Sequence, residues 1–249
     1  MATVASHVAQ LPGAEEVFTT LNTATFADVA VVHVAKQAVV ETPLHLLFVS
    51  TGNNSISQPR CIVVAEASSQ VSLIEDYVSI GDGGGLCNAV TEIVVAANAQ
   101  VNHSLIQREA RGMFHIGKTS VIQSQDSRYT NVAVQMGAAL SRHNVETHHQ
   151  GTQVETNLYG LALVAGEQLA DTHSNIQYNH PHCSSDQLYK AIATDKGRSV
   201  FSGRVGVPKA AQQTSAAQLN RNLLLSNKAR IDTKPQLEII ADDVKCSHG

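Results

Sequence analysis

The sequence repeats one short pattern, Ala67-Ser68-Ser69-Gln70-Val71 and Ala97-Asn98-Ala99-Gln100-Val101, at an offset of 30 residues. Lys36-Gln37-Ala38-Val39 is a looser copy of the same pattern. Small residues followed by a β-branched residue, at periods of roughly 20–50 residues, are typical of solenoids, in which each coil buries its apolar face against its neighbours. The repeat therefore favours a β-solenoid. A β-sandwich, which would show turns about every 8–12 residues, remains the structural alternative.

Strand-like segments recur along the whole chain and are separated by the turn residues Gly, Asn, Asp, Ser and Pro. Long amphipathic helix patterns are scarce. Residues 216–230 are the one ambiguous stretch, because Leu219, Leu223 and Leu224 also fit helical spacing. The expected strands are 29–34, 44–49, 61–65, 71–77, 90–96, 101–106, 119–124, 131–136, 160–165, 199–207 and 236–240.

The composition limits the classes of function. Of the 249 residues, 43% are hydrophobic but only 4% are aromatic, and there is no Trp. The formal net charge of −4 gives no electrostatic reason for binding nucleic acid or an anionic membrane. No apolar run approaches the roughly 18 residues that a membrane span needs, and no signal-peptide pattern opens the chain. The length fits one elongated domain or two ordinary ones, and we expect no nucleic-acid partner and no membrane span.

The four cysteines, Cys61, Cys87, Cys183 and Cys246, are scattered and form no CxxC pair. In a chain of this length they do not indicate a disulfide framework, so a reducing, cytosolic setting fits them best. Cys61 and Cys87 are expected to be small buried hydrophobes.

The closing motif Cys246-Ser247-His248 follows a β-rich stretch, where residues i and i+2 project from the same face of a strand. The sulfur and a ring nitrogen could then reach one metal or one partner surface. Two donors cannot complete a zinc site or hold an iron–sulfur cluster, each of which typically takes four ligands. The motif is therefore half of a site. The preceding Asp242 and Asp243 are expected to form a solvated turn.

Other polar motifs have weaker interpretations. His148-His149 would point to opposite faces of a strand and is expected to lie in an exposed loop. His173, His180 and His182 lie near Cys183 in the sequence, but no spacing fixes a metal geometry. The glycine-rich residues 81–85 lack the Lys and Ser/Thr of a P-loop, so they predict a flexible turn between coils and no ATP hydrolysis.

From about residue 171 onward the sequence resembles the SufB/SufD family of iron–sulfur cluster assembly proteins, and its closing motif resembles the SufD branch. The resemblance rests on order, spacing and residue identity in six stretches. They are HCSSDQLYK (182–190), DKGRSVFSG (195–203), AQQT (211–214), QLNRNLLLS (218–226), KPQLEI (234–239) and ADDVKCSHG (241–249).

The resemblance implies a right-handed parallel β-helix, flanked in longer members by helical segments at both ends. It implies a non-enzymatic scaffold in which SufD pairs with SufB, while the ATPase SufC binds through C-terminal helices. An iron–sulfur cluster would be held only transiently, in the complex, and the chain alone would bind no cofactor tightly. Cys246 and His248 match the family positions at the SufB–SufD interface. The resemblance therefore implies that they bind the nascent cluster there, either by ligating its iron directly or by carrying its sulfur.

The chain ends at Gly249, before the helices that would hold SufC. Relative to the family we therefore expect one truncated all-β core domain, residues 1–249, without flanking helical segments. A solenoid with an uncapped end exposes strand edges, so the isolated chain is expected to form a homodimer through its C-terminal coils. The expected location is the cytoplasm, or the plastid stroma in a photosynthetic eukaryote.

Two rival functions come from other β-helix classes. A β-helical enzyme acting on polysaccharide would stack sugars on aromatic rings, which are rare in this chain. A left-handed β-helix acyltransferase would show sustained hexapeptide repeats, whereas Ile80-Gly81 and Ile116-Gly117 are isolated.

Overall fold

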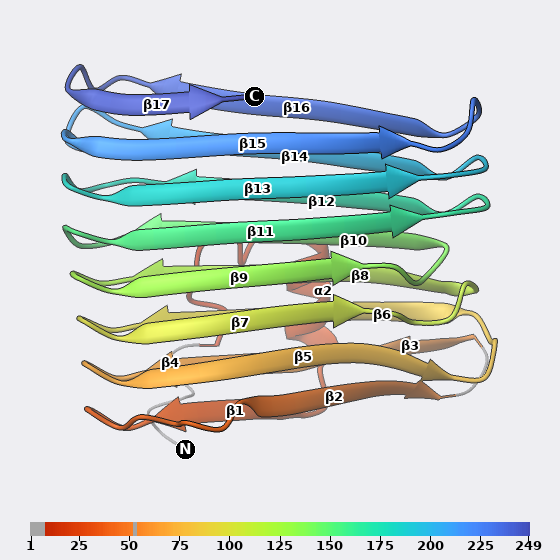
Figure 1. The fold of residues 1–249 in the computed structure, drawn as a ribbon. Helices are drawn as coiled ribbons and strands as arrows, with labels where there is room; N and C mark the ends of the chain where they lie inside the picture. Colours follow the sequence, from red (N-terminus) through yellow and green to blue (C-terminus); the bar gives the residue numbers. More distant parts are fainter. Residues whose placement is uncertain (1–7, 52–53) are drawn as a thin grey trace.

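The computed structural model describes residues 8–51 and 54–249. Two parallel sheets face each other, and the chain alternates between them, so that each coil contributes a strand to both (Figure 1). The front strands run left to right, the back strands return, and the chain climbs from the N-terminal to the C-terminal coil in a right-handed sense (Figure 1). The expected all-β, right-handed parallel β-helix is confirmed.

The first sheet has nine strands and the second has eight within the described residues. The nine-stranded sheet comprises β1 (Val29–Val34), β3 (Ser55–Ser57), β4 (Arg60–Ala65), β6 (Gly85–Val95), β8 (Met113–Gln123), β10 (Leu140–His149), β12 (Leu169–Gln177), β14 (Arg198–Val207) and β16 (Arg230–Ile239). The eight-stranded sheet comprises β2 (Leu44–Thr51), β5 (Gln70–Ile80), β7 (Gln100–Gln107), β9 (Arg128–Gln135), β11 (Glu155–Val164), β13 (Ser184–Ala193), β15 (Thr214–Leu224) and β17 (Val244–His248).

The sequence repeat corresponds to one coil. Gln70 pairs with Gln100 and Val71 with Val101 in the register of β5 and β7. The residues before these strands form a sharp corner that requires a left-handed backbone, which Asn, Asp and a few other residues tolerate. The residues at this corner in successive coils all have positive φ: Gln37, Ser68, Asn98, Asp126, Gln153, His182 and Gln213. Their alignment explains why the pattern of small and polar residues recurs once per coil.

One helix, α2 (Val17–Thr25), lies behind the nine-stranded sheet (Figure 1). It is held there by polar contacts: Asn22 Nδ2 donates to the carbonyl of Asn88 over 2.8 Å, and Arg60 donates to Asn22 Oδ1 over 3.1 Å. Arg60 also pairs with Glu92 beneath the helix, where both side chains are buried. This helix was not predicted, because its threonines and asparagine carry little helix signal. In the described part of the chain, no helix has the length and apolar character required to cross a bilayer.

Two local expectations were wrong. The ambiguous stretch 216–230 is not a helix: β15 continues to Leu224, and β16 begins at Arg230 after a turn. His148-His149 is not in an exposed loop but ends β10, where His149 is fully buried and His148 faces outward beside Glu146. The two rings do lie on opposite faces, as a strand requires.

Five strands were missed by the sequence analysis, namely β3, β10, β12, β13 and β17, and β15 lies in the stretch that was left ambiguous. In β10 the buried positions alternate regularly, but they are occupied by Ser141, His143, Val145, Thr147 and His149. A polar inward face hides the alternation of apolar and polar residues by which strands are recognised. The interior of this β-helix is therefore partly polar.

Candidate functional site

The closing motif lies on β17, the outermost strand of the eight-stranded sheet, which pairs with β15. Cys246 is in register with Ala216, and His248 with Gln218, and both of these partners are buried. Because strands in register present side chains in the same direction, Cys246 and His248 occupy inward-facing positions on one face of β17. The two residues therefore share a face, as i and i+2 spacing predicts.

Their surroundings differ. Cys246 is half-buried and packs against the hydrophobic core, whereas His248 is exposed. Partial burial raises the pKa of the Cys246 thiol, although a hydrogen bond with the backbone of Ala216 opposes the rise. The thiol is thus protonated at neutral pH unless a metal displaces the proton. Asp242 and Asp243 lie in an exposed turn before β17, as expected.

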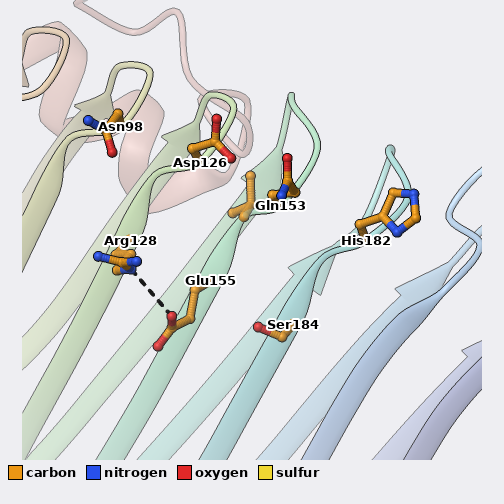
Figure 2. Close-up of a pocket in the computed structure, with 8 residues that line it drawn as sticks. Asn98, Asp126, Arg128, Gln153, Glu155, His182 and Ser184 are labelled. Carbon is orange, nitrogen blue, oxygen red and sulfur yellow. Dashed lines mark ion pairs between the residues drawn. The ribbon is translucent and has the colours of Figure 1, made fainter.

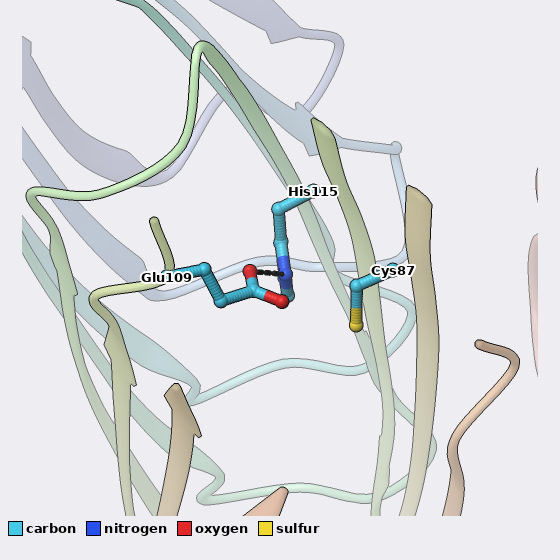
Figure 3. Close-up of side chains that lie close together, drawn as sticks. All are labelled: Cys87, Glu109 and His115. Carbon is cyan, nitrogen blue, oxygen red and sulfur yellow. Dashed lines mark hydrogen bonds and ion pairs between the residues drawn. The ribbon is translucent and has the colours of Figure 1, made fainter. Parts of the chain in front are cut away.

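A group that the sequence analysis missed lies inside the β-helix, where Cys87, Glu109 and His115 converge (Figure 3). Cys87 on β6 and His115 on β8 are register partners, and Glu109 comes from the loop between β7 and β8. One donor atom from each residue lies within 4.8 Å of the other two, and all three residues are buried. In the residues that the structure describes, this is the one group of three or more potential metal ligands.

The contacts within this group are strongly polar. His115 Nδ1 lies 2.7 Å from Glu109 Oε2, which also accepts a hydrogen bond of 3.2 Å from Gln107 Nε2. The other ring nitrogen, His115 Nε2, is buried without a hydrogen-bond partner. Burial alone would lower the pKa of His115, but Cys87 and Glu109 beside the ring outweigh burial and raise the pKa to about 10. Without a metal, the imidazole is therefore held as a cation against the Glu109 carboxylate.

A second buried carboxylate–histidine pair lies in neighbouring coils. Glu75 accepts hydrogen bonds from Thr91 Oγ1 over 2.8 Å and from Tyr77 Oη over 3.0 Å. His103 Nε2 lies 3.6 Å from Glu75 Oε1. Burial alone would raise the pKa of Glu75, but the His103 ring and the two hydroxyl donors outweigh burial and lower it. All the Glu75 oxygens are thus occupied by protein groups.

Further along the stack the buried histidines are neutral. His143 Nε2 lies 3.1 Å from Thr119 Oγ1, and His149 Nε2 lies 2.8 Å from Thr156 Oγ1. Burial lowers the pKa of each histidine to about 3. The only trace of this polar interior in the sequence is the high count of 12 histidines.

An open groove follows the corner residues of four coils (Figure 2). Asn98, Asp126, Gln153 and His182 line its rim, and below them Arg128 Nε lies 3.5 Å from Glu155 Oε2. Both members of this ion pair are substantially exposed, so the pair contributes little to stability. Among the residues that line the groove none is aromatic.

The structure also places the remaining motifs that the sequence analysis singled out. Cys183 is buried, and its thiol donates to the carbonyl of Gly151 over 3.4 Å. In the described ranges, no group of three potential ligands joins it to the nearby histidines. Residues 81–84 form the turn between β5 and β6. Cys61 and Cys87 are both buried, as expected, although Cys87 has polar neighbours rather than a purely apolar setting.

Comparisons with known proteins identify the family of the chain. Residues 48–249 match the family described as SUF system FeS cluster assembly, SufBD core domain. An iron–sulfur cluster assembly SufBD family protein of Synechocystis sp. is 44% identical over 99% of the chain and 56% of its own length. Protein ABCI7, chloroplastic, of Arabidopsis thaliana is 39% identical over 94% of the chain and 51% of its own length.

The iron–sulfur cluster assembly protein SufD of Escherichia coli is 37% identical over 72% of the chain and 43% of its own length. The chain thus spans about half the length of these relatives. The family match covers most of both sheets, including the whole of β17. The chain therefore belongs to the SufBD core family of the SUF system for iron–sulfur cluster assembly, and its resemblance to SufD is confirmed.

Proposed function

We propose that this chain is the core of a non-catalytic scaffold subunit for iron–sulfur cluster assembly, and that Cys246 and His248 hold the nascent cluster. The observation that carries the proposal is the register of β17, which puts a sulfur and an imidazole nitrogen on one face of the outermost strand. Thiolate and imidazole are both established ligands of iron in such clusters. Iron and sulfide are the cargo of the scaffold rather than a resident cofactor.

The missing ligands are assigned to a partner. Cys246 and His248 supply two donors, and in the described residues no third potential ligand completes a group with them. A SufB-type paralogue facing β17 would supply the remainder across a heterodimer interface. Cluster formation would then require both subunits, while ATP hydrolysis would fall to a SufC-type partner.

Exposed apolar residues on the last coils support an interface there. Leu223, Leu224 and Leu225 are 51–60% exposed at one end of the coil, after most of β15, and Ile240 is 64% exposed at the other end, after β16. Exposed apolar side chains favour contact with another protein. In the absence of a SufB-type partner, the same residues would allow two copies of the chain to associate. The bacterial and chloroplastic relatives support a location in the cytoplasm or the plastid stroma.

The polysaccharide enzyme remains without support. Its substrate groove would require stacking aromatic rings, and the groove in Figure 2 is lined by polar side chains and one valine. No observation favours this function over the scaffold.

The test compares Cys246→Ala, His248→Ala and Ser247→Ala in the full-length protein, each expressed with its SufB-type and SufC-type partners. Iron, acid-labile sulfide and the visible absorbance of the purified complex are measured. We expect Cys246→Ala and His248→Ala to lower cluster content at least about tenfold, since ligands are removed. Ser247 lies between them and is exposed, so Ser247→Ala should leave cluster content unchanged. Normal cluster content in the Cys246→Ala complex would refute the assignment.

A further inference from the structure

We propose that Cys87, Glu109 and His115 form a second metal site, buried inside the β-helix, that binds one divalent transition-metal ion of the Zn²⁺ class. The proposal is independent of the cluster site on β17, because the two sites lie on different coils and share no residue. The ligands would be Cys87 Sγ, a ring nitrogen of His115 and a carboxylate oxygen of Glu109.

The three donors are brought together by the β-helix itself. Cys87 and His115 are direct partners in the parallel register of β6 and β8, so their side chains enter the interior side by side (Figure 3). Glu109 reaches the same point from the facing corner of the coil (Figure 3). A spread of at most 4.8 Å between donor atoms is close enough for small side-chain rotations to place all three around one ion. A water molecule would complete a four-coordinate site.

One ring nitrogen of His115 has no protein partner. His115 Nε2 is buried and has no hydrogen-bond partner, which is costly for a polar atom in the interior. Gly117 lies two residues further along β8, and a Cβ at that position would lie 3.1 Å from Nε2. The glycine therefore leaves the free nitrogen accessible to a ligand inside the core. A metal ion that displaced the Nε2 proton would give this buried atom the partner that it lacks.

The surrounding groups hold the ligands in place. A Cβ on Gly137 would meet the backbone nitrogen and oxygen of Glu109 at 2.4 Å, so the next coil packs directly on the Glu109 backbone. Gln107 Nε2 orients the carboxylate, and the Tyr77 ring packs edge-on against His115 at a centroid distance of 4.8 Å. Such outer contacts orient the ligands of metal sites and raise affinity.

The donor set selects the class of metal. A thiolate, an imidazole and a carboxylate suit Zn²⁺ and related first-row ions, whereas Mg²⁺ and Ca²⁺ prefer oxygen ligands throughout. The coils nearby contain the same three residue types in Cys61, Glu75 and His103, but the Glu75 oxygens are occupied by Thr91, Tyr77 and His103. Cys61 is therefore a matched control, being a buried cysteine beside a carboxylate that has no free oxygen.

The experiment uses the full chain carrying Cys246→Ala and His248→Ala, so that the proposed cluster ligands cannot contribute. Because the donors are buried, the protein is refolded with and without Zn²⁺, and bound metal is measured after dialysis. We expect one Zn²⁺ per chain. A Co²⁺-refolded sample should show a thiolate-to-cobalt charge-transfer band and the visible bands of tetrahedral Co²⁺. Zn²⁺ should also raise the thermal midpoint.

Cys87→Ser is expected to weaken Zn²⁺ binding at least about tenfold and to abolish the charge-transfer band, whereas Cys61→Ser should retain both. His115→Gln and Glu109→Gln provide further variants if Cys87→Ser fails to fold. Zn²⁺ absent from the parent, or equal binding by the Cys87→Ser and Cys61→Ser variants, would show that the group is only a buried hydrogen-bonded cluster. A negative result would leave the cluster site on β17 untouched, and loss of that site would not affect this one.

Discussion

The buried Cys87–Glu109–His115 group and the closing strand β17 use the same kinds of donor in opposite surroundings. In the buried group, a cysteine and a histidine on neighbouring coils are joined by a carboxylate from the facing corner. On β17 the cysteine and histidine follow each other along one outermost strand, with His248 exposed. A cysteine–histidine pair in the interior of the stack can therefore gain a third potential ligand from the same chain, whereas the same pair on the outermost strand does not. The position of the pair in the stack, rather than its residue types, makes this difference.

The two regions should also differ in how a substitution affects folding stability. The interior groups are desolvated, so each polar atom depends on partners from adjacent coils, and loss of one partner is costly. The closing motif is mostly hydrated, and substitution there should affect binding with little effect on folding. Matched substitutions in the two regions can test this difference directly.

The largest expected effect comes from removing a buried charge. Glu75→Ala would leave Thr91 and Tyr77 without their common acceptor and His103 without a carboxylate beside its ring. We expect the free energy of unfolding to fall by about 3–5 kcal/mol, as for other broken buried pairs. Asp243→Ala, in the exposed turn before β17, should change it by less than about 0.5 kcal/mol. Urea denaturation of both variants makes the measurement, and equal losses would remove the distinction between the regions.

A smaller effect is expected from overpacking. Gly137→Ala would place a methyl group too close to the backbone nitrogen and oxygen of Glu109. These backbone atoms cannot move aside as the end of a flexible side chain could. A loss of about 1–3 kcal/mol is expected. Gly249→Ala beside the closing motif meets Leu219 Cδ1 at 3.4 Å, which is an ordinary contact, and should be nearly neutral. If Gly137→Ala were as stable as the parent in the same denaturation assay, the close packing of the next coil on Glu109 would be disproved.

The smallest effect concerns pH. The pKa of His149 is about 3 in the folded protein and about 6.5 in the unfolded chain. Between these two pH values, the unfolded chain binds a proton at His149 that the folded protein does not bind. This contribution to stability is complete above pH 6.5 and is lost as the pH falls toward 3. Between pH 7 and pH 5 the loss is on the order of 2 kcal/mol.

His149→Gln should therefore flatten the fall in thermal midpoint between pH 7 and pH 5, although it lowers the midpoint at pH 7. Ser247→Ala on β17 introduces no change in a titrating group and should keep the parental pH dependence. A His149→Gln profile parallel to that of the parent would mean that folding does not protect the His149 ring from protonation.

The sequence predicted the parts of the fold whose interior is apolar. The repeat ending in Gln70-Val71 and Gln100-Val101 revealed the coil, because one coil places the same small residues at the same corner. Strand β10 was missed because its inward positions carry Ser, His and Thr. The stretch 216–230 was ambiguous for a different reason. The leucines near the end of β15 are exposed, so their spacing in the sequence indicates neither the buried face of a helix nor the buried face of a strand.

One candidate site could be predicted from the sequence and the other could not. The sequence predicts that Cys246 and His248 share one face of a strand, because side chains alternate between the two faces along the chain. The sequence could not predict the grouping of Cys87, Glu109 and His115. These residues lie on β6, in the loop before β8 and on β8, and only the register between coils brings them together. Coil lengths vary, so the register between strands cannot be counted from the chain.

The sequence by itself determined the solenoid, the family resemblance and the two donors of the closing motif, because these follow from local spacing and residue identity. The tertiary structure decided which histidines are neutral, which carboxylates are fully occupied, and where sulfur, nitrogen and oxygen donors converge. The physical reason is that desolvation and contact between coils depend on the register of distant strands, and only the folded stack sets that register.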